Sequence, residues 1–220
     1  MELSYWESRW NKDKTGFHMD EGYPGLKNYW PALNLSSNSR VLVPLCGKSV
    51  DMIFLEQQGA DVVGVEVSQK AVLSFFSEQR REFHTKDYSG FTIHTSGNIE
   101  LWQGDFLKYP AQKSGFDLIY DKAALVALPP TKQTSYVDKL HSLAGPDTKI
   151  LLHHFVYPQH EMQGPPFSVK PQKIDDYFSD QFTLSLLEEK RIPSEQFIPF
   201  RRRGLKSSIT ERLLILKPRK

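Results

Sequence analysis

The chain has 220 residues, of which 39% are hydrophobic and 25% are charged, and this composition supports a packed core and excludes a disordered chain. Its 28 basic and 26 acidic residues leave a formal net charge of +2, too small to indicate a nucleic-acid or membrane partner. The sequence has no apolar run long enough to cross a bilayer, and its single cysteine excludes an internal disulfide. We expect one domain over residues 1–220, a monomer in the cytoplasm that acts on a small molecule.

Apolar β-branched runs alternate with amphipathic stretches from Arg40 onward, which is typical of βα units around a parallel sheet. The seven predicted strands are residues 40–46, 61–67, 99–103, 116–120, 149–156, 182–188 and 211–216. Helices are predicted after the N-cap residues Ser49 and Ser68, from Pro130 to a C′ residue at Gly145, and around residues 174–178. No helical pattern separates the last two strands, so we expect them to be antiparallel. The predicted fold class is α/β, with a mostly parallel sheet and helices on both faces.

Two segments fall outside this pattern. Residues 85–98 are polar and contain glycine, which predicts a loop with a short extra strand at residues 91–93. Residues 1–39 precede the first predicted strand and are rich in aromatic side chains. We therefore expect an N-terminal extension over residues 1–39 and an α/β core over residues 40–220.

The candidate site lies beyond the carboxyl ends of the strands, where open parallel sheets bind their ligands. Gly47 follows the first strand and lets the backbone approach a ligand at a helix N-terminus. Glu66 ends the second strand, where a carboxylate can accept hydrogen bonds from both ribose hydroxyls. A turn glycine and a strand-end carboxylate explain this pair equally well. One glycine, against three in the dinucleotide fingerprint, favours a ligand with ribose and adenine but no pyrophosphate, such as S-adenosylmethionine.

Further candidates follow the third and fourth predicted strands. Asp105 can accept a hydrogen bond from the adenine amino group, and Phe106 can pack against the ring. The alternative interpretation is a turn acid beside a core aromatic residue. Asp121 and Lys122 directly follow the fourth predicted strand, as Asp105 and Phe106 follow the third.

Other reactive side chains have simpler explanations. Cys46 has no visible histidine partner, and we expect it to be a small buried residue. No metal site is predicted, since the spacing of His153, His154, His160 and Glu161 matches no known ligand pattern. We expect a solvated loop at residues 201–206 and a solvated tail at residues 217–220.

Taken together, short motifs spread over nearly the whole chain resemble those of the thiopurine S-methyltransferase family. The motifs are residues 6–10 (WESRW), 15–18 (TGFH), 44–52 (PLCGKSVDM), 64–68 (GVEVS), 97–101 (GNIEL), 116–130 (FDLIYDKAALVALPP) and 164–167 (GPPF). The resemblance implies a single Rossmann-like class I methyltransferase domain with seven strands. It also implies S-adenosylmethionine as the cofactor and S-adenosylhomocysteine as its product.

The resemblance also implies site residues. The cofactor-binding positions fall on Trp10, Leu45, Glu66 and Lys122, with Trp6, Phe17, Asp105 and Phe106 as further walls beside Gly47. The aromatic residues of the extension would then form a lid that excludes water from the sulfonium. Because Trp6 and Trp10 are four residues apart, a helix face packed on the core is the other interpretation, and both can hold.

The family usually has arginine where this chain has Lys122, and lysine keeps the charge but lacks the planar fork of arginine. We expect cofactor binding to survive this difference, with Lys122 and Asp121 as the catalytic candidates that steer an anionic acceptor. Residues 164–167 would shape the acceptor pocket or form only a turn.

The implied reaction is an in-line displacement in which the thiolate of an aromatic or heterocyclic thiol attacks the methyl carbon of the sulfonium and S-adenosylhomocysteine leaves. Alignment and exclusion of water supply most of the rate. The alternatives are another soft acceptor (thiocyanate, halide, sulfide, or a selenium or tellurium species), a regulator that binds S-adenosylmethionine without turnover, and a nucleic-acid methyltransferase. The near-neutral charge disfavours the last of these.

Overall fold

The computed structural model describes residues 3–110 and 115–219. It contains two compact units, Met1–Ile119 and Tyr120–Lys220, and strand β6 (Phe116–Lys122) runs from the first into the second. Each unit is α/β in composition, as predicted. The expectation of one domain, with residues 1–39 as an extension, stays a prediction.

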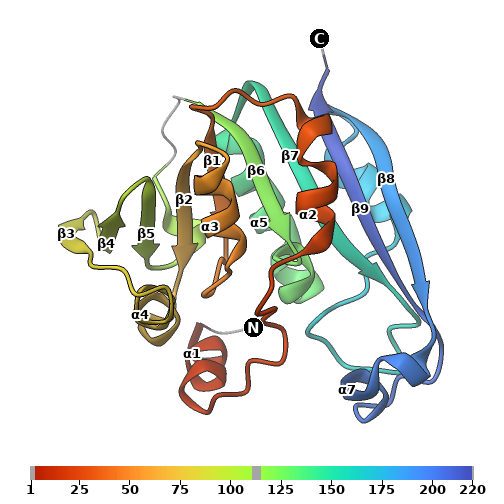
Figure 1. The fold of residues 1–220 in the computed structure, drawn as a ribbon. Coiled ribbons are helices and arrows are strands. Elements are labelled where there is room, and N and C mark those ends of the chain that lie inside the picture. The colour runs from red at the N-terminus through yellow and green to blue at the C-terminus, as the bar shows by residue number, and fades with distance from the viewer. Residues whose placement is uncertain (1–2, 111–114, 220) are drawn as a thin grey trace. The chain divides into compact units, whose positions relative to one another are not determined.

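The first unit contains most of the parallel strands. Its elements are α1 (Leu3–Asn11), α2 (Pro24–Tyr29), η1 (Trp30–Leu33), β1 (Arg40–Pro44), α3 (Asp51–Gln57), β2 (Asp61–Glu66), α4 (Gln69–Glu78), β3 (His84–Tyr88), β4 (Phe91–Ser96), β5 (Ile99–Gln103), η2 (Phe106–Lys108) and the start of β6. The hydrogen-bonded strand order is β3-β4-β5-β2-β1-β6 (Figure 1). Strands β5, β2, β1 and β6 run parallel to one another. Strand β4 runs antiparallel to β5, and β3 runs antiparallel to β4.

The register of β1 and β2 positions the candidate site. Both strands are buried almost throughout, as expected for continuous apolar runs covered on two faces. They pair from Arg40↔Asp61 to Pro44↔Val65, so their carboxyl ends are adjacent. Ser68 caps α4 as predicted, since its Oγ accepts from the Ala71 N–H at 3.3 Å.

The prediction of a loop at residues 85–98 is wrong, whereas the short extra strand predicted at residues 91–93 is confirmed as part of β4. A hairpin of β3 and β4 occupies this segment, paired from His84↔Thr95 to Tyr88↔Phe91. Its turn has positive φ at Ser89 (49°) and Gly90 (83°), as type I′ hairpin turns require. Only β4 has a partly buried apolar pattern, and every residue of β3 is exposed, so β3 shows no alternation of its own. Residues 3–110 and 115–219 therefore form nine strands rather than the predicted seven.

The second unit holds the rest of β6, η3 (Leu125–Ala127), α5 (Pro130–Leu143), β7 (Ala144–Val156), α6 (Pro171–Phe178), β8 (Phe182–Ile192), η4 (Ser194–Gln196), α7 (Ile198–Arg201) and β9 (Ile209–Pro218). Its strand order is β6-β7-β9-β8 (Figure 1). The predicted antiparallel pairing of the last two strands is confirmed, and β9 also runs antiparallel to β7.

Three details of the second unit correct the predictions. The short helices η4 and α7 lie between the last two strands, where no helix was expected. Gly145 lies in β7, which begins at Ala144, directly after α5. Residues Lys217 and Pro218 end β9 and are not part of a free tail. Among residues 3–110 and 115–219, no helix combines the length and apolar character needed to cross a membrane.

Candidate functional site

The loop after β1 has a strained backbone. Leu45 and Gly47 have φ of 49° and 55°, and a left-handed conformation costs a residue other than glycine about 1 kcal/mol or more. A Cβ atom added at Gly47 would also lie 2.9 Å from Cζ2 of Trp10. Glycine is therefore required at position 47 by conformation and by close approach. Strain of this kind concentrates at functional sites.

Glu66 faces this loop from the end of β2. Its carboxylate is 6% exposed, and it accepts hydrogen bonds from the Gly47 N–H (2.9 Å) and the Ser68 N–H (2.8 Å), one on each oxygen. Burial raises the pKa of Glu66, and these backbone donors oppose the rise. The Val67 N–H is a third backbone donor to this carboxylate, which leaves capacity for about one more donor. The predicted proximity of Gly47 and Glu66 is confirmed.

The end of β5 adjoins the same point. The Gly104 N–H donates to the backbone oxygen of Glu66 at 2.9 Å, which brings Asp105 next to the β2 terminus. The Asp105 side chain caps η2 by accepting from the Leu107 N–H at 3.0 Å, and Phe106 is 2% exposed. The turn-acid and core-aromatic interpretations thus describe both residues correctly, and their contacts with adenine stay a prediction.

The aromatic residues of the N-terminal segment form one cluster. The Phe17 ring makes edge contacts with Trp6 and Trp10, at centroid distances of 5.5 and 5.4 Å. Trp10 is buried and lies against Gly47, whereas Phe17 is 41% exposed. Helix α1 packs against α4, so the packed-face interpretation of Trp10 is confirmed. The lid function stays a prediction.

A groove of about 620 Å³ lies between α1 and α4. It reaches Ser68 and is lined by polar side chains that include Lys70 and Glu78. Lys70 forms an ion pair with Asp13 at 2.6 Å. Ser68, whose N–H donates to Glu66, is among the lining residues of the groove, whereas Glu66 itself is not.

Cys46 lies between Leu45 and Gly47, the two loop residues with positive φ. It is 7% exposed, and burial, followed by the charge of Glu66, raises the pKa of its thiol well above the ordinary value. A thiol of this kind remains protonated and is a poor nucleophile. Its environment therefore agrees with a small buried residue.

In the second unit, Asp121 and Lys122 have contrasting environments. Asp121 is fully buried, and burial raises its pKa from 3.8 to about 6. Lys122 is half-buried at the end of β6, and neighbouring side chains of a strand point to opposite faces. Burial and then the charge of Lys122 lower the pKa of His153. Lys122 therefore has the environment of a residue that could steer an anion, and Asp121 has that of a structural acid.

Two of the four residues that were considered for a metal, His154 and Glu161, have separate partners. Nδ1 of His154 hydrogen-bonds with the Val169 carbonyl at 3.0 Å. Glu161 accepts from Ser207 Oγ (2.6 Å) and from the N–H groups of Ser207 and Lys206, and these bonds lower its pKa to about 2. Within the described part of the chain, no group of three or more His, Cys, Asp or Glu residues could hold a metal ion.

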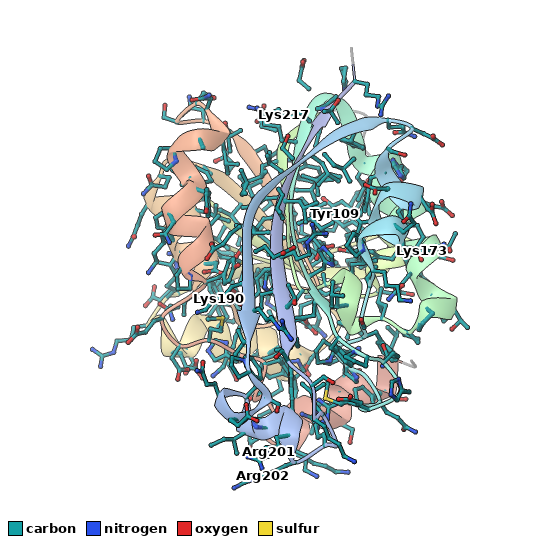
Figure 2. The ribbon with its side chains drawn as sticks, turned by 90° about the vertical axis from the view of Figure 1, so that its right-hand side faces the viewer. Tyr109, Lys173, Lys190, Arg201, Arg202 and Lys217 are labelled. Carbon is teal, nitrogen blue, oxygen red and sulfur yellow. The ribbon has the colours of Figure 1, made fainter. Side chains whose placement is uncertain are left out.

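The arginine run is exposed, in agreement with the expectation of a solvated segment. Arg201 ends α7 and Arg202 follows it, and Figure 2 shows both at this helix, with Lys190 further along β8. Arg203 donates to the Gln163 carbonyl at 2.6 Å and lies over the Phe200 ring.

Sequence reasoning missed Tyr136. Its hydroxyl donates to Asp121 Oδ2 at 2.8 Å inside the second unit. The helical pattern marks Tyr136 only as a core residue, although a buried tyrosine hydroxyl generally requires a partner. Asp121, a carboxylate at the end of a buried strand, was the feature of the sequence that could have indicated this partner.

Comparisons with known proteins agree with this geometry. The family model for thiopurine S-methyltransferase (TPMT) matches residues 1–217. A thiopurine S-methyltransferase of Pseudomonas fluorescens is 38% identical over 198 residues, which cover 90% of this chain and 89% of the relative. One from Shewanella woodyi is 40% identical over 200 residues, which cover 89% and 90%.

Solved structures show the same fold. The structure of a Burkholderia thailandensis N1-methyltransferase with bound S-adenosylhomocysteine has a TM-score of 0.66 at 14% identity and covers 99% of this chain and 87% of that one. An S-adenosylmethionine-dependent methyltransferase from Anabaena variabilis has a TM-score of 0.64 at 15% identity, with coverages of 99% and 95%. The predicted class I methyltransferase fold is confirmed, and the chain belongs to the thiopurine S-methyltransferase family.

Proposed function

We propose that this protein is an S-adenosylmethionine-dependent S-methyltransferase that methylates the sulfur of an aromatic or heterocyclic thiol. The observation that carries the proposal is Glu66, a buried carboxylate at the end of β2 that faces the strained Gly47 loop. Family membership supplies the reaction class. The same family supports the choice of a thiol acceptor.

The residues of the first unit fit the adenosine part of such a cofactor. Glu66 is the candidate acceptor for the ribose hydroxyls, and the missing side chain at Gly47 leaves the loop backbone open to close approach. Asp105, on the neighbouring strand end, is the candidate partner of the adenine amino group. Leu45 belongs to the same strained loop.

When bound, S-adenosylmethionine would supply an electrophilic methyl carbon for in-line attack by an acceptor sulfur, with S-adenosylhomocysteine as the leaving group. The indoles of Trp6 and Trp10 and the ring of Phe17 exclude water and present π faces to positive charge. Alignment and exclusion of water account for most of the rate, since a thiolate requires little proton transfer.

Lys122 favours the thiolate form of the acceptor. Its positive charge opposes protonation of His153 and also lowers the pKa of Glu211, although burial raises that pKa overall. The same field lowers the pKa of a thiol close to Lys122. A lysine provides this charge without the two-point geometry of arginine, so we expect a broad acceptor range.

The test is calorimetric titration with S-adenosylhomocysteine, followed by a methylation assay on 6-mercaptopurine. We expect micromolar binding that Glu66→Ala abolishes, because the variant loses the ribose acceptor and leaves the Gly47 and Ser68 N–H groups unpaired. Glu189→Ala, at a carboxylate on β8, is the matched control. Absence of binding by the unmodified protein would refute the proposal.

The assay also separates the alternative acceptors. Formation of the S-methyl thioether, detected by mass spectrometry, supports a thiol acceptor. Methylation of thiocyanate, halide, sulfide or selenium species without thiol methylation would refute the thiol assignment and keep the methyltransferase. Tight cofactor binding without turnover on any of these acceptors would indicate a regulator.

A further inference from the structure

The Asp121 carboxylate is committed to hydrogen bonds inside the second unit. Oδ1 accepts from the N–H groups of Ala124 (2.8 Å) and Leu125 (3.2 Å), and Oδ2 accepts from the Tyr136 hydroxyl (2.8 Å). Asp121 and Tyr136 are both fully buried. Neither side chain is therefore placed to touch an acceptor directly.

These bonds hold a strained turn that follows Lys122. Ala123 has a φ of 60°, a conformation that destabilises an alanine by about 1 kcal/mol or more. Its N–H donates to the His153 carbonyl at 3.3 Å, and the next two N–H groups bind Asp121. An aspartate that binds backbone donors further along the chain is a typical turn stabiliser. The hydrogen bonds to Asp121 thus stabilise the unfavourable backbone conformation of the turn at Ala123.

The turn is connected to the segment Gly164–Phe167. The carbonyl of Val126, in η3, accepts from the Phe167 N–H at 2.6 Å. The same segment is held by the Tyr157 hydroxyl, which donates to the Pro166 carbonyl at 2.6 Å. The conformation of η3 therefore sets one of the attachment points of this segment.

We propose that Asp121 and Tyr136 are positioning residues for the acceptor side of the site: their bond fixes the turn after Lys122 and, through Val126, the Gly164–Phe167 segment. This inference rests on the proposed function, in which Lys122 steers the acceptor. Glu66 and the Gly47 loop belong to the first unit, whereas Lys122 is the cofactor position implied in the second. Loss of the pair is therefore expected to change the acceptor KM more than the affinity for S-adenosylhomocysteine.

The test compares Tyr136→Phe with the matched control Tyr177→Phe, whose hydroxyl makes only a 3.4 Å bond to Gln133. With a thiol acceptor, Tyr136→Phe is expected to raise the acceptor KM roughly five- to tenfold, as loss of a hydrogen bond to a charged group predicts. The kcat and the Kd for S-adenosylhomocysteine should change less than about twofold. Tyr177→Phe should leave all three values unchanged.

Amide hydrogen exchange gives a readout that does not need turnover. Tyr136→Phe should accelerate exchange at Ala124, Leu125 and Phe167 roughly tenfold and leave other core amides unchanged. If the unmodified protein methylates no thiol, the proposed function fails, and the exchange data still decide whether the pair holds the turn. An unchanged acceptor KM in a folded Tyr136→Phe variant, or unchanged exchange at Phe167, would overturn the inference. If Tyr136→Phe does not fold, Asp121→Ala, which removes all three acceptor contacts, replaces it under the same criteria.

Discussion

The buried carboxylate of Asp121 makes the stability of the protein depend on pH. Its pKa of about 6 in the folded protein lies above the ordinary value of 3.8, so the native state binds this proton more tightly than the unfolded state. Stability from this group is therefore fully present below pH 3.8 and is lost as the pH rises through about 6. The difference between the two pKa values corresponds to about 3 kcal/mol of unfolding free energy. About 2 kcal/mol of this stabilisation is lost between about pH 4.5 and about pH 7.5.

The informative variant is Asp121→Asn. The amide keeps the size of the side chain and an oxygen acceptor for the Ala124 and Leu125 N–H groups, but it does not titrate. Urea unfolding at a series of pH values, followed by circular dichroism, gives the free energy of unfolding of both proteins. The stability of the unmodified protein relative to Asp121→Asn should fall by about 2 kcal/mol from about pH 4.5 to pH 7.5.

A control and a refuting outcome complete this experiment. Asp176→Asn, at an exposed carboxylate on α6, measures the effect of removing a surface charge from the same unit. If the free energies of unfolding of the unmodified protein and Asp121→Asn change in parallel with pH, Asp121 is not held as a buried, hydrogen-bonded carboxylate, and the argument from burial fails.

Three further predictions concern the two units separately. Gly47→Ala should weaken S-adenosylhomocysteine binding at least tenfold by calorimetry, because of the positive φ and the contact with Trp10; unchanged affinity would contradict the close-approach argument. Lys122→Ala should raise the acceptor KM about tenfold in steady-state kinetics, with Lys122→Arg close to the unmodified enzyme; equal KM values for all three would exclude steering. Glu161→Gln should speed trypsin cleavage near Ser207 by weakening three hydrogen bonds; unchanged cleavage would show that these bonds do not order the loop.

Local patterns in the sequence predict the parallel part of the sheet and the core of the candidate site. Strands β1 and β2 are continuous apolar runs, and their parallel pairing brings Gly47 to Glu66. The Ser68 cap is equally local, since it depends on residues three apart. These features can be predicted from the local sequence and from the rule that ligands bind at the carboxyl ends of parallel strands.

The β3 strand shows where such patterns fail. Its residues are all exposed, so it has no buried face that could produce an apolar alternation. The strand is formed by its ladder with β4 and by the contact of the Tyr88 ring with Trp102, at a centroid distance of 5.7 Å. Those contacts are tertiary, and only the Ser89-Gly90 turn signal was available in the sequence.

The assignment of Asp121 and Lys122 to one catalytic role shows a second limit. Adjacent residues at a strand end suggest one site, yet adjacent side chains of a strand point to opposite faces. One of the two must then face the core, and a carboxylate there requires several donors. The donors are the Ala124 and Leu125 N–H groups and the Tyr136 hydroxyl. Strand alternation thus predicts that Asp121 and Lys122 have different roles. Which of the two is buried depends on Tyr136 of α5, and that contact is tertiary.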